Sequence, residues 1–377
     1  MKDLIIMYRV DRKNPKGTWS GTSYSLSKAL SNYVNIITLD LQEDRVLRHL
    51  DKLCIRLGGI ARLSHLGLIC GTVHDLILSV KANFLLNKYR NNPVLEIGID
   101  VRIHNKYYIY QDLSYAVLAD SINELSMNLD KTSGGARINL SDKELQRRIR
   151  VQRNEYKKAS KVFFMGQWVT KRMKELYPEL TDKFLAVGGG LNPEFQVNKR
   201  TSERVKENAI IFIGFDFQRK AGDLVMEAFH LLREKYLENA SLYIVGPENI
   251  TMDSKYEEHN IILLGKLDRD KLGAVLEKCK VFCMPSRFEA YGLVFIEALC
   301  YGLPCIGRRK YEMPYFIRDG YNGLLIDDDD IAEIAEKMHI LLSNNTFQNN
   351  VANNTAFYCK QYSWDNVAQR ILSSILT

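Results

Sequence analysis

The sequence lacks the features that hold together a small secreted or metal-stabilised domain. Its 377 residues include seven cysteines, an odd number, and no pair of them has C-x-x-C spacing. No histidines stand near the cysteines at the spacing of a zinc site. We therefore expect buried thiols in a reducing compartment rather than disulfides or structural zinc.

The sequence also predicts neither a secretory leader nor a membrane span. The first residues, MKDLIIMYRVDRKN, pass from a short apolar run straight into charges, unlike a secretory signal. Residues 63–86 form the most apolar longer stretch, but a span requires ~20 apolar residues without interruption. Four polar residues interrupt this one: His65, His74, Asp75 and Lys81. The sequence predicts a packed helix pair here, and a cytoplasmic protein.

Negative charge is scarce in the first half of the chain. Residues 1–200 contain 32 Lys and Arg against 20 Asp and Glu, whereas residues 201–377 contain 20 against 25. A basic half predicts an anionic partner, such as a phosphate-bearing acceptor or the inner face of the plasma membrane. A solvated basic surface is an equally good interpretation. The most basic predicted helix, 142–159, carries Arg147, Arg148, Arg150, Arg153, Lys157 and Lys158.

Short apolar runs alternate with amphipathic segments along the second half. The predicted strands are 209–214, 241–246, 261–265, 280–284 and 304–306, and the predicted helices are 223–236 and two that begin near Asp268 and Phe295. Alternating strands and helices predict a parallel sheet with crossover helices. This half is expected to be a Rossmann-like α/β domain.

The first half repeats the pattern less clearly. Its predicted strands are 4–8, 34–39, 94–99, 107–110 and 161–165, with helices at 22–30 and 142–159. A glycine run that meets a proline, GGGLNP at 188–193, predicts the domain boundary. The expected organisation is an N-terminal domain over 1–190, a C-terminal domain over 191–360, and a final helix over 361–377 that packs back on the N-terminal domain.

The acidic run Asp327–Asp330 could suggest a metal site, but it directly precedes the helix-like sequence IAEIAEKMHILL. Its last aspartate is a natural N-cap, and the others favour the positive end of the helix dipole. We therefore expect capping rather than metal binding.

The most informative motif is PSRFEAYGLVFIEA at 285–298, which leaves a predicted strand and opens a helix. Parallel sheets bind ligands at such loops because the first N–H groups of the helix can receive phosphate oxygens. Gly292 lets the backbone approach a ligand closely. Glu289 can accept hydrogen bonds from sugar hydroxyls, and Glu297 can accept them from a ribose diol.

This stretch resembles the E-x7-E signature of retaining glycosyltransferase family 4. The next residues, LCYGLPCI at 299–306, are similar to the family's continuation, as are Glu312-Met313 and GYNGLL at 320–325. The resemblance implies two Rossmann-like domains facing each other across a cleft, the GT-B fold, with the nucleotide-sugar donor in the C-terminal domain.

A second element, FIGFDFQRKAG at 212–222, resembles the family's strand, G-x-D-x-x-x-K-G loop and helix. The resemblance places Arg219 and Lys220 at the donor diphosphate. The sequence departs from the common pattern at Phe215, where many relatives have arginine, and at Ala221, which precedes the usual glycine. The donor pocket is therefore expected to have one cation fewer.

The resemblance also identifies the remaining donor-binding candidates. In relatives, the backbone after the third strand of this domain contacts the nucleobase. The corresponding residues here are Lys266 and Leu267. Packing alone would also explain the apolar residues of this segment. The full predicted set is Gly21, Gly214, Arg219, Lys220, Lys266, Leu267, Ala290, Tyr291, Gly292, Leu293, Val294 and Glu297.

The first domain offers a weaker site. Gly21, in the turn KGTWSGTSY, opens a helix and could hold a phosphate or carboxylate, although a plain N-cap by Ser20 explains the turn nearly as well. Asp112 ends the strand at which relatives approach the transferred sugar, and would orient a hydroxyl or the backbone. His74 and His104 are alternatives to it.

The resemblance implies sugar transfer to a glycan, lipid-linked or other acceptor with retained anomeric configuration, in polysaccharide biosynthesis. Glu289, Asp112 and Lys220 are the catalytic candidates, with no metal, no cofactor and no nucleic-acid partner expected. The alternative is a catalytically silent nucleotide-sugar-binding subunit. An epimerase or a phosphorylase is a weaker candidate, and a dehydrogenase is disfavoured because neither half has G-x-G-x-x-G after its first strand.

Overall fold

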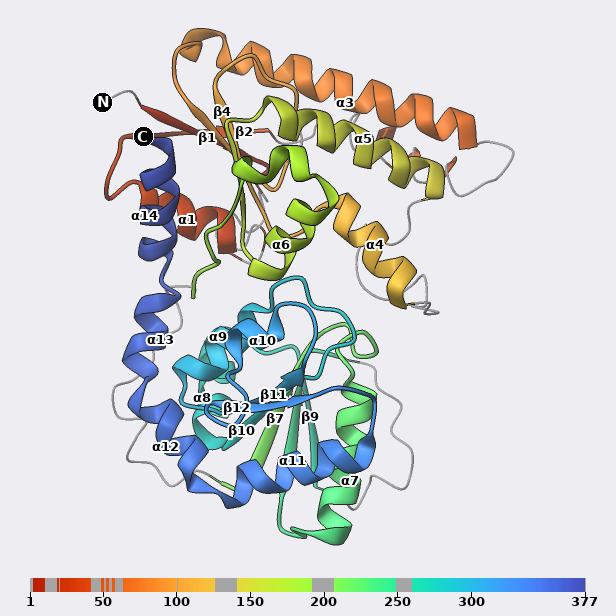
Figure 1. Ribbon diagram of the computed structural model, residues 1–377, viewed down its shortest axis with the longest axis vertical. Coiled ribbons are helices and arrows are strands. Elements are labelled where there is room, and N and C mark those ends of the chain that lie inside the picture. Colours follow the sequence, from red (N-terminus) through yellow and green to blue (C-terminus); the bar gives the residue numbers. More distant parts are fainter. Residues whose placement is uncertain are drawn as a thin grey trace. The chain divides into compact units, whose positions relative to one another are not determined.

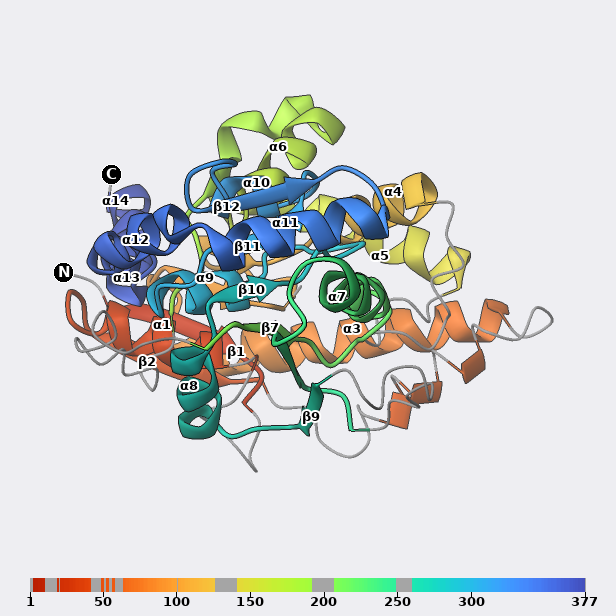
Figure 2. The same cartoon turned by 90° about the horizontal axis from the view of Figure 1, so that it is seen from below.

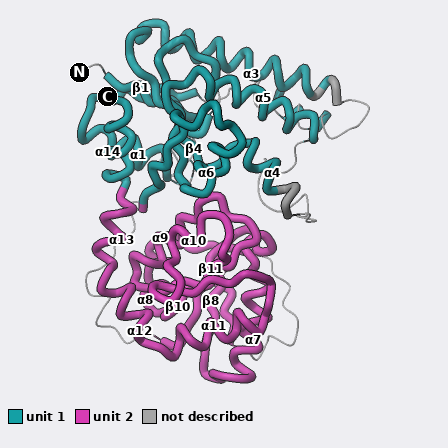
Figure 3. Tube along the Cα trace, in the orientation of Figure 1, with its two compact units in different colours: residues 1–190, 364–377 teal, residues 191–363 magenta. Residues whose placement is uncertain are grey.

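The computed structural model describes residues 3–10, 19, 21–41, 49–50, 52–53, 56–57, 64–99, 101–125, 141–191, 207–248 and 260–376. The chain divides into two compact units (Figure 3). Unit 1 comprises residues 1–190 and 364–377, and unit 2 comprises residues 191–363. Each unit contains one parallel sheet, so the prediction of two Rossmann-like α/β domains is confirmed.

The sheet of unit 1 has six parallel strands in the order β2-β1-β3-β4-β5-β6. Its first and fourth strands, β1 (Leu4–Tyr8) and β4 (Tyr107–Gln111), are buried along their whole length, as expected for strands covered on both faces. The other strands are β2 (Ile36–Asp40), β3 (Val94–Ile97), β5 (Lys161–Phe164) and β6 (Phe184–Ala186).

Helices surround this sheet (Figure 1). They are α1 (Thr22–Leu30), α3 (Ser64–Leu86), α4 (Tyr115–Leu125), α5 (Asp142–Lys158) and α6 (Gln167–Leu176), with short 3₁₀ turns at Asn87–Tyr89 and Pro178–Lys183. Helix α5 begins at a cap that its sequence provides: Ser141 Oγ accepts a hydrogen bond from the Glu144 amide.

The last helix, α14 (Trp364–Ile375), belongs to unit 1, where it packs on α1 (Figure 1). The Tyr33 hydroxyl donates to Asp365 over 2.7 Å, and Arg370 donates to the Val187 carbonyl over 2.9 Å. A Cβ on Gly190 would lie 2.6 Å from the Trp364 ring, so only glycine permits this close approach. The two ends of the chain thus complete one domain.

The sheet of unit 2 has the order β12-β11-β10-β7-β8-β9, again all parallel. Its strands are β7 (Ala209–Ile213), β8 (Ser241–Val245), β9 (Ile261–Gly265), β10 (Val281–Cys283), β11 (Cys305–Arg308) and β12 (Gly323–Ile326). Since consecutive strands run outwards from β7 in one direction and from β10 in the other, β7 and β10 form the topological switch point.

Helices α7 (Gly222–Lys235), α8 (Arg269–Lys278), α9 (Leu293–Cys300), α10 (Met313–Phe316), α11 (Ile331–Ser343), α12 (Asn345–Asn353) and α13 (Thr355–Gln361) complete unit 2 (Figure 2). Two aspartates cap helices here, and the cap by Asp330 was predicted. Asp268 accepts from the Lys271 amide at the start of α8, and Asp330 accepts from the amides of Ala332 and Glu333 at the start of α11.

The prediction of a helix pair over residues 63–86 is wrong, because the structure has one continuous helix there, α3. Among the described residues, the segment Leu68–Tyr89 is long and apolar enough to cross a membrane, with a mean hydropathy of 1.3. The polar residues that interrupt it in sequence do not interrupt the helix. His74 and Lys81 are seven positions apart and so lie on one side of it.

Candidate functional site

The two loops that the sequence singles out meet at the switch point of unit 2. Strand β7 leads into the loop 214–221 and strand β10 into the loop 284–292, and the two strands are hydrogen-bonded neighbours. Crevices outside the carboxyl ends of parallel strands bind ligands at such a point. The fold therefore brings together two motifs that are about 70 residues apart in the chain.

The loop after β7 depends on tight backbone geometry. A Cβ on Gly214 would lie 2.9 Å from Lys220 Cγ, and a Cβ on Gly222 would lie 2.2 Å from the Phe217 ring. Ala221 caps α7 in the left-handed conformation, with φ of 62°. Ala221, at which the sequence departs from the family pattern, therefore has a strained backbone conformation.

Backbone and side-chain hydrogen bonds join the two loops. The Arg287 amide donates to the Arg219 carbonyl, and the Arg219 guanidinium donates to the Phe288 carbonyl, each over 2.9 Å. The same guanidinium pairs with Asp216 at 2.8 Å. Arg219 therefore fixes the position of its neighbour Lys220 relative to the 284–292 loop.

Lys220 and Glu289 form an ion pair at the centre of this junction. Both side chains are largely buried. Burial lowers the pKa of Lys220, while the Glu289 carboxylate acts in the opposite direction. The Ser286 hydroxyl adds a hydrogen bond to the same Glu289 oxygen over 3.4 Å. A buried cation beside a buried carboxylate can hold a phosphate and a sugar hydroxyl at neighbouring positions.

Helix α9 presents its N-terminus next to this pair. Its N-cap, Gly292, has φ of 94°, and a Cβ there would lie 3.0 Å from Phe295 and 3.1 Å from Glu289 Cγ. The first amides of a helix have no partner within it, so those of Leu293 and Val294 can receive an anion.

Glu297 lies one turn into α9 and is buried. Burial raises its pKa to about 8, although the nearby Arg269 charge lowers it. Burial thus favours the protonated form of this carboxyl. Its role in binding a ligand stays a prediction.

The sequence analysis missed an arginine network beside the site. Arg287 pairs with Asp223 at 2.7 Å and with Asp329 at 3.3 Å, and Arg308 also pairs with Asp329. Arg308 donates to the Ser286 carbonyl over 3.2 Å as well. Asp329 was expected only to interact favourably with the helix dipole. In the structure it pairs with Arg287 and Arg308, which hold the loop after β10 in place. No local sequence signal could have found this network, because Arg287 and Arg308 are 42 and 21 residues from Asp329 in the chain.

The ends of β8 and β9 bring further glycines to this edge of the sheet. The Gly246 amide donates to the Gly265 carbonyl over 2.8 Å, and a Cβ on Gly246 would lie 2.8 Å from the Gly214 carbonyl group. Lys266, which follows β9, is exposed, and Leu267 is partly exposed. Both are therefore accessible, and their contact with a base stays a prediction.

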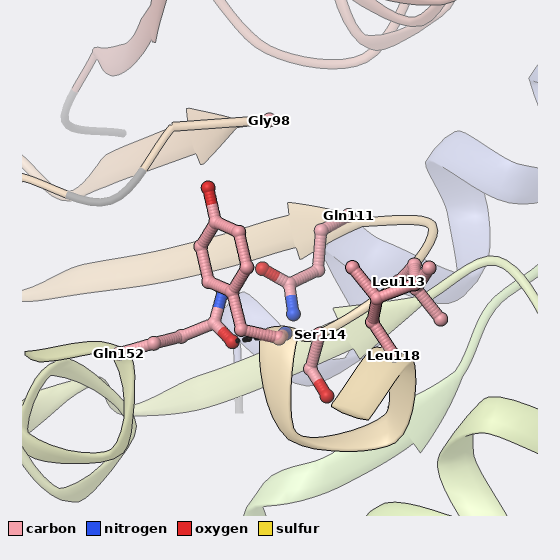
Figure 4. A pocket seen from close by; sticks show the side chains of 7 residues that line it. Gly98, Gln111, Leu113, Ser114, Leu118 and Gln152 are labelled. Carbon is pink, nitrogen blue, oxygen red and sulfur yellow. Dashed lines mark hydrogen bonds between the residues drawn. The ribbon is translucent and has the colours of Figure 1, made fainter. Parts of the chain in front are cut away.

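Unit 1 gathers polar groups at the carboxyl end of β4. Gln111, Ser114 and Gln152 line a small hollow of about 40 Å³ with Gly98 and Leu118 (Figure 4). Gln111 donates to the Tyr156 hydroxyl, and Gln152 accepts from the Tyr115 amide over 2.9 Å. Gln152 comes from α5, a helix that the sequence analysis treated only as basic.

The predicted residues of unit 1 occupy different places. Asp112 lies just after β4, where it accepts from the Leu113 amide over 2.8 Å. Gly21 is the N-cap of α1, with φ of 86° and no side-chain cap hydrogen bond, whereas Ser20 lies outside the described residues. His104 precedes β4 and so lies at the opposite end of that strand from Asp112. His74 is buried on α3 beside Asp75.

Comparison with known proteins agrees with the geometry of unit 2. Residues 194–373 match glycosyl transferases group 1. The matched segment contains the β7 loop, the β10 loop and α9, hence every group of the unit 2 site described above. The match supports a glycosyltransferase with a nucleotide-sugar donor.

Similarity to individual proteins also points to glycosyltransferases. An uncharacterized glycosyltransferase of Methanocaldococcus jannaschii is 24% identical over 287 residues, which cover 75% of this chain and 77% of that protein. A Campylobacter jejuni α-1,4-N-acetyl-D-galactosaminyltransferase that acts on a diphospho-undecaprenol-linked glycan is 27% identical over 175 residues, or 45% of this chain and 48% of that protein. The chain thus spans about half the length of the second relative.

The fold of this chain has solved counterparts. The structure of WaaG, a glycosyltransferase involved in lipopolysaccharide biosynthesis, aligns with a TM-score of 0.64 at 14% identity, covering 99% of each chain. This likeness, with the two parallel Rossmann-like sheets, confirms the predicted GT-B fold class.

Proposed function

We propose that this protein transfers a sugar from a nucleoside diphosphate sugar to a glycan or lipid-linked acceptor, with retention of anomeric configuration. The Lys220–Glu289 pair at the switch point is the observation that carries the proposal. The donor diphosphate takes the Lys220 ammonium and the first amides of α9. Glu289, released from part of its pairing, accepts hydrogen bonds from the sugar hydroxyls.

The other residues of unit 2 complete the donor site in this proposal. Glu297 accepts from the ribose diol, and the backbone near Lys266 and Leu267 contacts the base. Arg219 and Gly214 hold the diphosphate loop, while Ala290 and Tyr291 shape the sugar pocket. Catalysis then comes from orienting the substrates and stabilising the charge of the departing diphosphate, with no metal and no cofactor.

The acceptor belongs to unit 1 in this proposal. Asp112 follows β4 and Gly21 follows β1, so both come after the carboxyl end of a strand. Parallel sheets bind ligands at that edge. The basic composition of residues 1–200 suits a phosphate-bearing acceptor. The Campylobacter relative uses a lipid-linked acceptor, which supports a role in polysaccharide biosynthesis at the inner face of the plasma membrane.

The test is transfer from a panel of nucleoside diphosphate sugars to acceptors extracted with membranes, followed by NMR of the anomeric proton of the product. Retention gives the donor's anomeric configuration in the product, and inversion would contradict the proposed stereochemistry. Donor binding without transfer to any acceptor would favour a silent nucleotide-sugar-binding subunit instead.

A further inference from the structure

Helix α3 exposes large apolar side chains along one side. Its exposed large apolar residues recur at intervals of three or four positions and so form a single stripe: Leu66, Ile69, Val73, Leu76, Ile77, Val80 and Phe84. Val80 is 62% exposed and Phe84 is 79% exposed. Only 28% of the most apolar part of this helix is buried, whereas a core helix would be mostly buried.

The inward side of α3 combines the buried apolar residues Leu78, Ala82 and Leu86 with polar groups that bond to other parts of unit 1. Asp75 pairs with the buried Arg147 of α5, and the buried Ser79 accepts from the Arg102 amide over 3.2 Å. Asn83 donates to the Arg102 carbonyl over 2.7 Å and accepts from the His104 amide over 3.1 Å. These polar bonds and the buried apolar residues hold the helix on unit 1. The exposed apolar stripe therefore contributes little to its attachment.

The same bonds exclude a helix that crosses the membrane in this fold. Crossing would require the Asp75–Arg147 pair and the Asn83 hydrogen bonds to break inside hydrocarbon, where no water can replace them. A helix that lies in the membrane plane keeps all of them and covers only its outer stripe.

The surface next to this stripe is basic. Helices α3 and α5 contact each other (Figure 1), and the exposed charged residues of α5 are one acid and five bases: Asp142, Lys143, Arg150, Arg153, Lys157 and Lys158. Arg150 and Leu76 line a shared hollow of about 380 Å³ between the helices, together with Arg102. Cations thus border the apolar stripe directly.

Two of the basic residues that the sequence analysis names on α5 are engaged within unit 1. Arg147 is buried and pairs with Glu144 at 2.8 Å, and Arg148 pairs with the same carboxylate at 2.8 Å and donates to the Tyr115 hydroxyl. Both therefore hold the helix in place rather than face an external partner.

We propose that α3 docks unit 1 on an anionic lipid bilayer, with its apolar stripe inserted among the acyl chains and the α5 cations at the headgroups. A second copy of this chain fits less well, because a symmetric α3–α3 contact would bring the two basic α5 surfaces together. An anionic membrane satisfies both the apolar stripe and the adjacent positive charge. The proposal specifies the membrane partner suggested above, and thus rests on that part of the proposed function.

The primary experiment is flotation of the full chain with vesicles of phosphatidylglycerol and phosphatidylcholine. The variant Val80→Ser/Phe84→Ser should lose binding by at least tenfold, whereas Phe357→Ser on α13, where Phe357 is 60% exposed, should bind like wild type. Arg150→Glu should weaken binding, and salt should weaken it further. Equal binding of the α3 variant and wild type would overturn the proposal, as would no binding to these vesicles at low salt.

A second measurement reports insertion directly. Phe84→Trp should give tryptophan emission that vesicles with brominated acyl chains quench, and Phe357→Trp should add no quenched emission. Absence of quenching at position 84 contradicts insertion. A dimer that depends on α3 but binds no vesicle, detected by sedimentation velocity, would assign the stripe to a second copy. Binding of a nucleoside diphosphate sugar should be unchanged in all α3 variants, so failure of docking can be distinguished from failure of the donor site.

Discussion

Lys220 and Glu289 join the loops after β7 and β10 through a buried ion pair. Each charge has been removed from water and depends on the other, unlike the charges of a pair on the surface. A donor diphosphate would give Lys220 a second anion and allow Glu289 to turn towards the sugar. The ion pair is therefore both a structural link and the centre of the proposed donor site.

Glu289→Gln should lower kcat by orders of magnitude, because the variant loses a sugar-facing carboxylate that acts in the transition state. Steady-state kinetics with the preferred donor measures this. An unchanged kcat would remove Glu289 from the site.

The same substitution leaves the buried Lys220 charge without its carboxylate. Breaking a buried pair costs ~3–5 kcal/mol of unfolding free energy, whereas removing both charges costs less. Urea unfolding of Glu289→Gln, Lys220→Met and the double variant should therefore show strong coupling. Additive losses would mean that the two side chains act independently.

Lys220→Ala should weaken donor binding and slow transfer together, since the diphosphate loses a cation in the ground state and in the transition state. Lys235→Ala, at the other end of α7, is the matched control and should behave like wild type. Normal affinity of Lys220→Ala for the nucleoside diphosphate, measured by calorimetry, would refute the contact.

Glu297 predicts a specific pH dependence of stability. The raised pKa, about 8, means that the folded protein keeps a proton that the unfolded chain releases above its ordinary pKa of 4.5. Unfolding free energy should therefore fall as pH rises between these values, by up to ~1.4 kcal/mol per pH unit. Glu297→Gln should remove this slope in denaturant titrations from pH 5 to pH 8. An identical slope in the variant would show that another group is responsible.

Phe215 is 71% exposed beside Gly214, at the position where relatives of the suggested family have arginine. Phe215→Arg should strengthen binding of a nucleoside diphosphate by ~1.5–3 kcal/mol, the range for a hydrogen bond to a charged group. Phe357→Arg, on α13, supplies the same charge elsewhere and should change the affinity little. Equal affinities of the two variants would place Phe215 outside the diphosphate site.

Much of unit 2 could be predicted from sequence because its strands are short buried apolar runs with glycine at their ends. Strand β9 was predicted at its observed bounds, and β7 and β8 to within one residue. The link between Lys220 and Glu289 could not be predicted, because it depends on which strands are neighbours. Strand order depends on long-range packing, which no local pattern reports.

The error at α3 has a different cause. Polar residues were taken as interruptions along the chain, whereas the helix continues through them and places His74 and Lys81 on one side. The hydropathy of the stretch did not reveal which side of the helix faces inwards. That orientation depends on Arg147, Arg102 and His104, which belong to other parts of unit 1.

A thermal-shift panel of nucleoside diphosphate sugars, run on wild type and Lys220→Ala, tests whether unit 2 binds the donor. The measurement does not require the acceptor to be known. At least one sugar nucleotide should stabilise the wild type, by ~2.7 kcal/mol at 100 times its Kd, and should stabilise Lys220→Ala much less at the same concentration. If no sugar nucleotide stabilises the wild type, or if one stabilises both proteins equally, the assignment of the donor site to the Lys220–Glu289 junction is contradicted.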